Sequence, residues 1–224
     1  MQQRLITCLL VAVGLHGISF GQNNSIYRDP LEIRAARADS AILAIKNGAL
    51  ILRLTSGTKK IEELNRLANT AGISTSRQKR LRKMAQSSQE ETDRINRLLV
   101  EEFSSQFDFS KVLFMYDTAV QHLKNGVSTG IFLDKNLQPD PAATLGGASY
   151  CIAYFGREPN NLAGSKVEGV LTMNSDFKLL ENPFPYFVSQ IKYFLLFVKR
   201  PEEKYFQLLV RRYNKALHNY FSKM

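Results

Sequence analysis

Residues 49–54 read ALILRL and residues 111–116 read KVLFMY, and these two apolar runs decide the fold class. Both runs are short and almost wholly apolar, which is typical of strands that are covered on both faces. Such strands need a layer of helices above and below the sheet. The sequence therefore predicts an α/β fold.

Three further strands are predicted at residues 130–133 (GIFL), 149–155 and 167–173. A short helix over 117–126 gives the connection before 130–133 the length of a helical crossover, which implies parallel neighbours. The loop between the last two strands is too short for a helix, so we expect that pair to be antiparallel. Together these segments predict a mixed, mostly parallel five-stranded sheet.

The remaining segments have helical patterns. Asp29-Pro30 is a typical helix start, and this first helix is expected to end at Asn47-Gly48. Residues 73–107 are predicted as helix, but the pattern leaves open whether they form one helix or two. Residues 186–199 and the segment after Pro201 are predicted as two C-terminal helices, which gives helices on both faces of the sheet.

The first 21 residues have the pattern of a cleavable signal peptide. Arg4 supplies positive charge, residues 5–15 are almost wholly apolar, and Ser19 and Gly21 are small residues before a cut at Gly21/Gln22. The apolar core of this segment spans only about 16 Å as a helix, against a hydrocarbon layer of about 30 Å. We therefore expect export with cleavage, to the periplasm or beyond it, and no transmembrane helix in the mature chain.

After cleavage, residues 22–28 are expected to be a disordered tether and residues 29–224 a single α/β domain. Cys8 leaves with the signal peptide, so Cys151 is alone in the mature chain and cannot form an internal disulfide. Cys151 lies in an apolar run, where a thiol usually behaves as a small buried hydrophobic group.

The chain has 30 Lys and Arg against 20 Asp and Glu, a formal net charge of +10. The signal peptide holds one basic residue and no acid, which leaves +9 after cleavage. The densest basic cluster consists of Arg77, Lys79, Arg80, Arg82 and Lys83. It predicts either an ordinary solvated helix face or contact with an anionic surface or envelope partner. Nucleic acid is not expected as the partner of an exported protein.

Three carboxylates stand just after apolar segments: Asp117, Asp134 and Asp176. Carboxyl ends of parallel strands meet at one sheet edge, so Asp117 and Asp134 can approach each other and act as an acid and base pair. His122 lies in the short helix after Asp117 and is the accompanying candidate. The alternative interpretation makes Asp117 a helix cap and His122 a surface residue.

No cofactor or metal site is expected. His122, His218 and Cys151 are too few His and Cys residues for a zinc site within one mature chain. There is no G-x-S-x-G motif, and Gly146-Gly147 lacks the spacing and the lysine of a phosphate-binding loop.

Three stretches carry a resemblance: KNGALILRL (46–54), FDFSKVLFMYD (107–117) and NPFPYFV (182–188). Together they resemble exported bacterial proteins of uncharacterised function, over most of the mature chain. The resemblance implies secretion in a bacterium and assigns no activity or site residue. We expect a non-catalytic binding or structural component of the periplasm; the alternative is a small hydrolase or transferase that uses Asp117 and Asp134.

Overall fold

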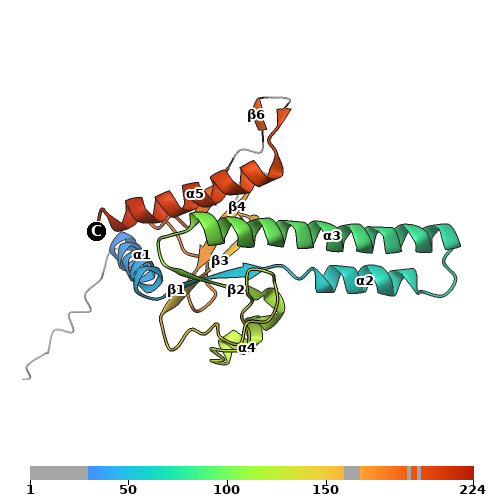
Figure 1. Ribbon diagram of the computed structural model, residues 1–224, viewed down its shortest axis with the longest axis horizontal. Coiled ribbons are helices and arrows are strands. Elements are labelled where there is room, and N and C mark those ends of the chain that lie inside the picture. Colours follow the sequence, from blue (N-terminus) through green and yellow to red (C-terminus); the bar gives the residue numbers. More distant parts are fainter. Residues whose placement is uncertain (1–29, 159–166, 191–192, 196–197) are drawn as a thin grey trace, which may run out of the picture.

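The computed structural model describes residues 30–158, 167–190, 193–195 and 198–224 (Figure 1). The predicted signal peptide and tether lie outside these residues. The helices are α1 (Pro30–Asn47), α2 (Thr58–Ala68), α3 (Thr75–Gln106), the 3-10 turn η1 (Asp117–Ala119), α4 (Val120–Lys124) and α5 (Glu202–Phe221). The strands are β1 (Ala49–Leu54), β2 (Lys111–Tyr116), β3 (Tyr150–Arg157), β4 (Glu168–Met173), β5 (Phe187–Ser189), β6 (Tyr193–Leu195) and β7 (Val198–Lys199).

The α/β class and the five-stranded mixed sheet are confirmed. Its strand order is β2-β1-β3-β4-β5, with β1 parallel to both β2 and β3. The pairs β3–β4 and β4–β5 are antiparallel, and β6 and β7 form a separate antiparallel pair. The prediction of a mostly parallel sheet is therefore wrong: two of the four pairings in the five-stranded sheet are antiparallel, as is the separate β6–β7 pair.

Two predicted elements account for this difference. Residues 130–133 do not form a strand; they make only isolated antiparallel bridges, one of them between Leu133 and Phe114 of β2. The predicted helix at residues 186–199 is wrong as well, because the described residues of this stretch include β5, β6 and β7. Short apolar runs fit a buried strand and a buried helix equally well, and here pairing of Val188 with Val170 of β4 favours the strand. Only one C-terminal helix, α5, is therefore present in the described chain.

The two faces of the sheet are covered differently. Helices α1, α3 and α5 pack with strands β1, β3 and β4 in one large apolar cluster on the first face. The second cluster combines the opposite side of β1 and β2 with Leu123 of α4 and loop residues such as Phe132 and Leu145. Because α4 is only five residues long, this face is covered mainly by irregular chain, and helical layers on both faces are not confirmed.

A close backbone contact joins α1 to the sheet. The helix ends at Asn47, and the next residue, Gly48, lies directly against the chain before β3. A Cβ atom on Gly48 would come within 1.9 Å of the Ser149 carbonyl oxygen. Glycine is therefore required for this approach, and Ala49 N–H donates to the same carbonyl at 3.0 Å.

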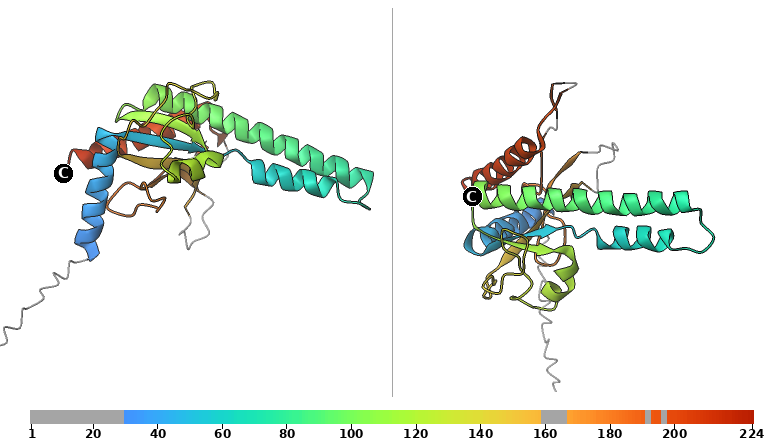
Figure 2. Two further views of the ribbon diagram at one scale, coloured as in Figure 1. Left: turned by 90° about the horizontal axis from the view of Figure 1, so that it is seen from below. Right: turned by 45° about the vertical axis from the view of Figure 1, so that its right-hand side comes forward.

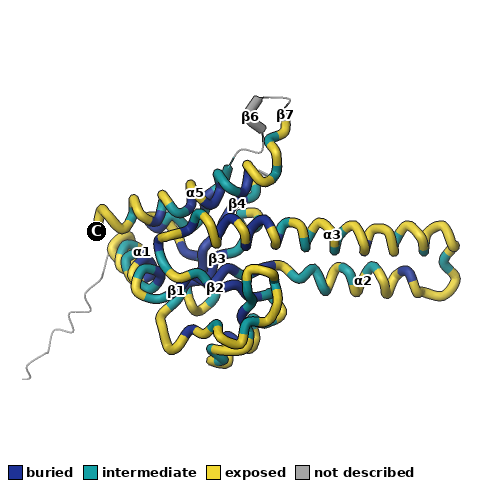
Figure 3. The backbone as a smooth tube through the Cα atoms, viewed as in Figure 1, coloured by how far each residue is buried: buried dark blue, intermediate teal, exposed yellow. Residues whose placement is uncertain are grey.

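Helices α2 and α3 form an antiparallel hairpin that extends away from the rest of the molecule (Figures 1 and 2). Helix α3 runs unbroken for 32 residues, so the open question about residues 73–107 is answered in favour of one helix. Its second half packs against α5, and its first half pairs with α2 outside the sheet region. The outer part of the hairpin is mostly exposed (Figure 3).

Candidate functional site

The outer end of the α2–α3 hairpin is the most distinctive surface of the described chain. The two helices meet along a narrow seam in which only Ala68 and Ala85 are buried. Half-buried side chains complete the seam, among them Leu64, Leu81 and Ser88. This seam buries little apolar surface, so the hairpin adds little to the hydrophobic stabilisation of the fold.

Two polar contacts order the turn between the helices. Ser74 is the N-cap of α3, and its hydroxyl accepts the Arg77 N–H at 3.4 Å. Arg82 donates from Nη2 to the side-chain oxygen of Asn69 at 3.3 Å, which connects the start of α3 to the end of α2. The basic cluster therefore lies on the first turns of α3, next to an ordered connection between the two helices.

The charge of this hairpin end has one sign only. Residues 64–89 contain six basic residues and no acidic one. One of the six, Arg66, forms a bidentate ion pair with Glu63, in which both N–O distances are 2.7 Å. This pair raises the pKa of Arg66 and lowers the pKa of Glu63. The side chains of the other five have no ion pair with any described residue. Arg82 is hydrogen-bonded to Asn69, and the four that remain are Arg77, Lys79, Arg80 and Lys83.

This arrangement opposes the helix dipole. Backbone N–H groups at the start of a helix carry partial positive charge, so cations there are unfavourable by about 0.3–1 kcal/mol each. The first turn of α3 has no acidic residue and includes Arg77. A bound anion would offset both the side-chain charges and the dipole at this end of α3.

The predicted carboxylate pair does not form. Asp117 follows the carboxyl end of β2, and its Oδ1 accepts the Ser56 N–H at 2.9 Å, linking the chain after β2 to the chain after β1. It starts η1 without capping it, since no side-chain cap hydrogen bond is present, so the helix-cap interpretation is wrong.

Asp134 lies in the chain that bridges to the middle of β2, away from the carboxyl end of that strand. Leu133 donates to the Phe114 carbonyl at 2.9 Å in an antiparallel bridge, so the chain past Leu133 heads away from the carboxyl end of β2. Three extended residues from Phe114 to Asp117 add about 10 Å of separation. Asp134 Oδ1 accepts the N–H groups of Asn136 and Gln138, both at 2.8 Å, and these hydrogen bonds lower its pKa.

The other candidates are also separated from each other. His122 lies exposed on α4. Asp176 follows β4, which runs antiparallel to β3, so it lies at the end of the sheet opposite to Asp117. Within the residues described, no group of three or more His, Cys, Asp and Glu side chains is arranged to bind a metal ion.

Cys151 is confirmed as a buried, free thiol. It is 1 % exposed, and burial raises its pKa to about 12. Because the thiolate is the nucleophilic form, this side chain is unsuited to nucleophilic chemistry at neutral pH.

A cavity between α1 and the loop after β4 was missed by the sequence reasoning. Arg37 and Lys178 line it from opposite sides, although they are far apart in the chain. Each residue alone resembles any other surface cation. Only the packing of α1 beside β3 and β4 brings them together, so no local pattern could have identified them.

No helix of the described chain combines the length and the apolar character that crossing a bilayer requires. Comparisons of the chain with protein-family models, with curated proteins and with solved structures each gave no match.

Proposed function

We propose that this protein is an exported, non-catalytic component of the bacterial envelope that binds an anionic lipid surface through the basic end of its helical hairpin. The observation that carries the proposal is the projecting turn of α2 and α3, which presents basic residues without an acidic neighbour. Lysine and arginine near an anionic membrane each contribute about 1 kcal/mol of attraction. Four unpaired cations are therefore sufficient for measurable attachment.

The distribution of these cations favours a lipid surface over an acidic protein. At 100° per residue, the cluster of Arg77, Lys79, Arg80, Arg82 and Lys83 occupies an arc of about 220° around α3. A flat acidic patch on a folded partner can face only part of that arc. A layer of lipid headgroups can surround the hairpin end and contact all of it.

Two further features agree with this choice. Leu67 and Met84 are 38 % and 44 % exposed on the outer part of the hairpin, where they can enter the boundary between headgroups and acyl chains. Residues 58–94 contain no aromatic or histidine side chain, so the hairpin lacks the stacking platform that single-stranded nucleic acid binding uses.

The carboxylates of the alternative enzyme interpretation have structural partners. Asp117 accepts one backbone N–H and Asp134 accepts two. Asp117 follows the end of β2, whereas Asp134 follows Leu133, which bridges to Phe114 in the middle of that strand. No observation in the described chain favours a hydrolase or transferase, and the non-catalytic role is therefore the one proposed.

The test compares a tip variant with a matched control. Arg77, Arg80 and Lys83 are changed together to Gln, and the control carries Lys135→Gln, Lys215→Gln and Lys223→Gln on exposed positions outside the hairpin. Co-sedimentation is measured with vesicles containing phosphatidylglycerol and with vesicles of phosphatidylcholine alone. Loss of three contributions of about 1 kcal/mol predicts binding weaker by about a hundredfold for the tip variant.

The control is expected to lose much less affinity than the tip variant. Raising the salt from about 0.1 M to about 1 M shortens the Debye length from about 10 Å to about 3 Å and is expected to release the wild-type protein. Equal losses in both variants, or equal binding to the two kinds of vesicle, would refute attachment through the hairpin. Export is tested separately by amino-terminal sequencing, which should begin at Gln22; recovery from the cytosol with Met1 in place would contradict it.

A further inference from the structure

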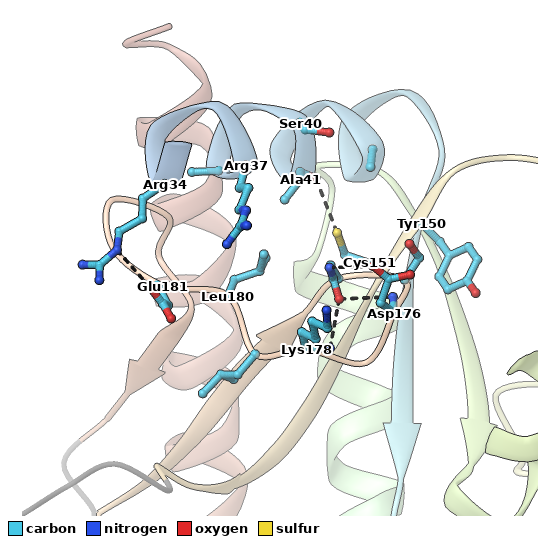
Figure 4. A pocket seen from close by; sticks show the side chains of 15 residues that line it. Arg34, Arg37, Ser40, Ala41, Tyr150, Cys151, Asp176, Lys178, Leu180 and Glu181 are labelled. Atoms are coloured by element: carbon cyan, nitrogen blue, oxygen red, sulfur yellow. Dashed lines mark hydrogen bonds and ion pairs between the residues drawn. The ribbon is translucent and has the colours of Figure 1, made fainter. Parts of the chain in front are cut away.

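The cavity between α1 and the loop after β4 has the dimensions of a small-molecule site (Figure 4). Its volume is about 450 Å³, within the range of about 300–1,000 Å³ that is usual for ligand pockets. It lies on the opposite end of the sheet from Asp117 and away from the hairpin. It is therefore independent of the proposed lipid-binding surface.

The floor of the cavity is apolar. It is formed by buried side chains from α1, β3 and the loop after β4: Ala38, Ala41, Cys151 and Leu180. The Cys151 thiol donates to the Ala41 carbonyl at 3.6 Å, so its polar hydrogen is already engaged. Such a floor favours a short hydrocarbon group over a polar one.

The wall opposite α1 is held in place by its own hydrogen bonds. The side-chain oxygen of Asn174 accepts the N–H groups of Asp176 and Lys178 at 3.1 and 2.9 Å. At one end of the cavity, Arg34 Nε and Glu181 Oε2 form an ion pair of 3.2 Å between α1 and this loop. A ligand would therefore meet a wall that is already formed, which lowers the entropic cost of binding.

Two cationic side chains at the cavity, Arg37 and Lys178, are not neutralised by an ion pair with a described residue. Figure 4 shows Arg37 directed from α1 and Lys178 directed from the loop into the space between them. Neither side chain has an ion pair with a described residue, whereas Arg34 and Glu181 neutralise each other. Asp176, the other carboxylate at the cavity, interacts with the side-chain amide of Asn174 at 3.4 Å. Two cations and one carboxylate leave a net charge of +1 to be balanced.

We propose that this cavity binds a small monoanionic molecule that carries one carboxylate and a short apolar chain. The carboxylate lies between Arg37 and Lys178, which supply N–H donors from opposite walls. The apolar chain lies over Ala38, Ala41 and Leu180. Arginine and lysine paired with a carboxylate make charge-assisted hydrogen bonds, which are stronger than neutral ones.

The proposal is tested by NMR titration of the purified exported protein with hexanoate. Saturable shifts are expected for the backbone amides of Ala41, Cys151 and Lys178. Hexylamine and 1-hexanol serve as matched probes with the same chain and without the anionic group. Hexylamine should give no saturable shift, and 1-hexanol should bind more weakly by about tenfold or more.

The variants Arg37→Gln and Lys178→Gln are each expected to weaken hexanoate binding by about tenfold. Lys135→Gln removes the same charge at an exposed position outside both the cavity and the hairpin, and it should leave the affinity unchanged. Both cavity residues are exposed, and a dispersed amide spectrum verifies the fold of each variant. Absence of saturable shifts, equal binding of hexylamine, or wild-type affinity in either cavity variant would overturn the assignment.

Discussion

One buried hydrogen bond joins α5 to the sheet, and its removal allows a quantitative test of the packing. The Tyr213 hydroxyl and the Thr172 hydroxyl lie 2.9 Å apart, and both residues are 0 % exposed. Burial raises the pKa of Tyr213 far above its ordinary value, so the phenol remains neutral. The contact is therefore a neutral hydrogen bond inside the main apolar cluster.

Tyr213→Phe leaves the Thr172 hydroxyl without its partner, and Thr172→Val leaves the Tyr213 hydroxyl without its own. An unpaired buried polar group costs about 1–3 kcal/mol, so each single variant is expected to lose about 1.5 kcal/mol of unfolding free energy. The double variant removes both polar atoms with little change of shape. We expect it to lose about 1 kcal/mol or less, which gives a coupling energy of about 2 kcal/mol.

Urea unfolding followed by far-ultraviolet circular dichroism measures these free energies, since the chain contains no tryptophan. The midpoints should move while the dependence on urea concentration stays the same, because the surface exposed on unfolding is unchanged. Additive losses in the double variant would refute the reasoning. They would mean that the two hydroxyl groups do not depend on each other.

Two further substitutions test the buried and the edge carboxylates. Glu102 is 8 % exposed, its Oε2 has no hydrogen-bond partner in the described chain, and desolvation followed by the nearby Glu101 charge raises its pKa. Because the pKa is raised, Glu102 stays protonated to a higher pH in the folded state than in the unfolded state, so stability falls as the pH rises above about 4.3. Glu102→Gln should therefore stabilise the protein by about 1 kcal/mol at pH 7 and by little at pH 4. Urea unfolding at the two pH values measures this difference. Asp117→Ala should cost about 1 kcal/mol through loss of the bond to Ser56 N–H, with vesicle binding unchanged in the co-sedimentation assay. A Glu102→Gln effect that does not vary with pH, or weaker vesicle binding by Asp117→Ala, would contradict these assignments.

Strands β1 and β2 could be predicted because most of their residues are apolar and pack into the clusters on the two faces of the sheet. Residues 49–54 and 111–116 are apolar except for Arg53 and Lys111, and both predicted ranges match β1 and β2. The boundaries of α1 and α5 also follow from local signals, since Pro30 begins one helix and Pro201 immediately precedes the other. These elements are determined by residues within their own segments.

The failures lie where distant partners decide the conformation. Residues 186–199 are apolar enough for a helix, but the free edge of β4 accepts Val188 as a neighbouring strand residue. Residues 130–133 have strand composition, yet Gly130 has a positive φ of 73° and only Leu133 bridges to β2. Neither outcome can be obtained from a local pattern, because each depends on which sheet edge is available.

The candidate site was predictable in its composition and not in its placement. The basic residues between Arg77 and Lys83 are evident in the sequence, but their position at the outer end of a hairpin depends on the pairing of α2 with α3. Residues 88–91 (SQEE) have a capping pattern that is typical of a helix start, but they lie inside α3. A continuous helix satisfies the backbone there, and the polar side chains remain near its surface.

The unbroken course of α3 also fixes a length. The segment from Thr75 to Thr92 spans about 26 Å as a helix, and the same helix continues into the packing against α5, where the Phe103 and Tyr213 rings are 6.0 Å apart. No hinge interrupts α3, so the hairpin acts as a rigid spacer, and the second half of α3 is anchored in the main apolar cluster. A partner bound at the outer end is therefore held at a fixed distance from the sheet. A force applied to that end acts on the aromatic packing between α3 and α5.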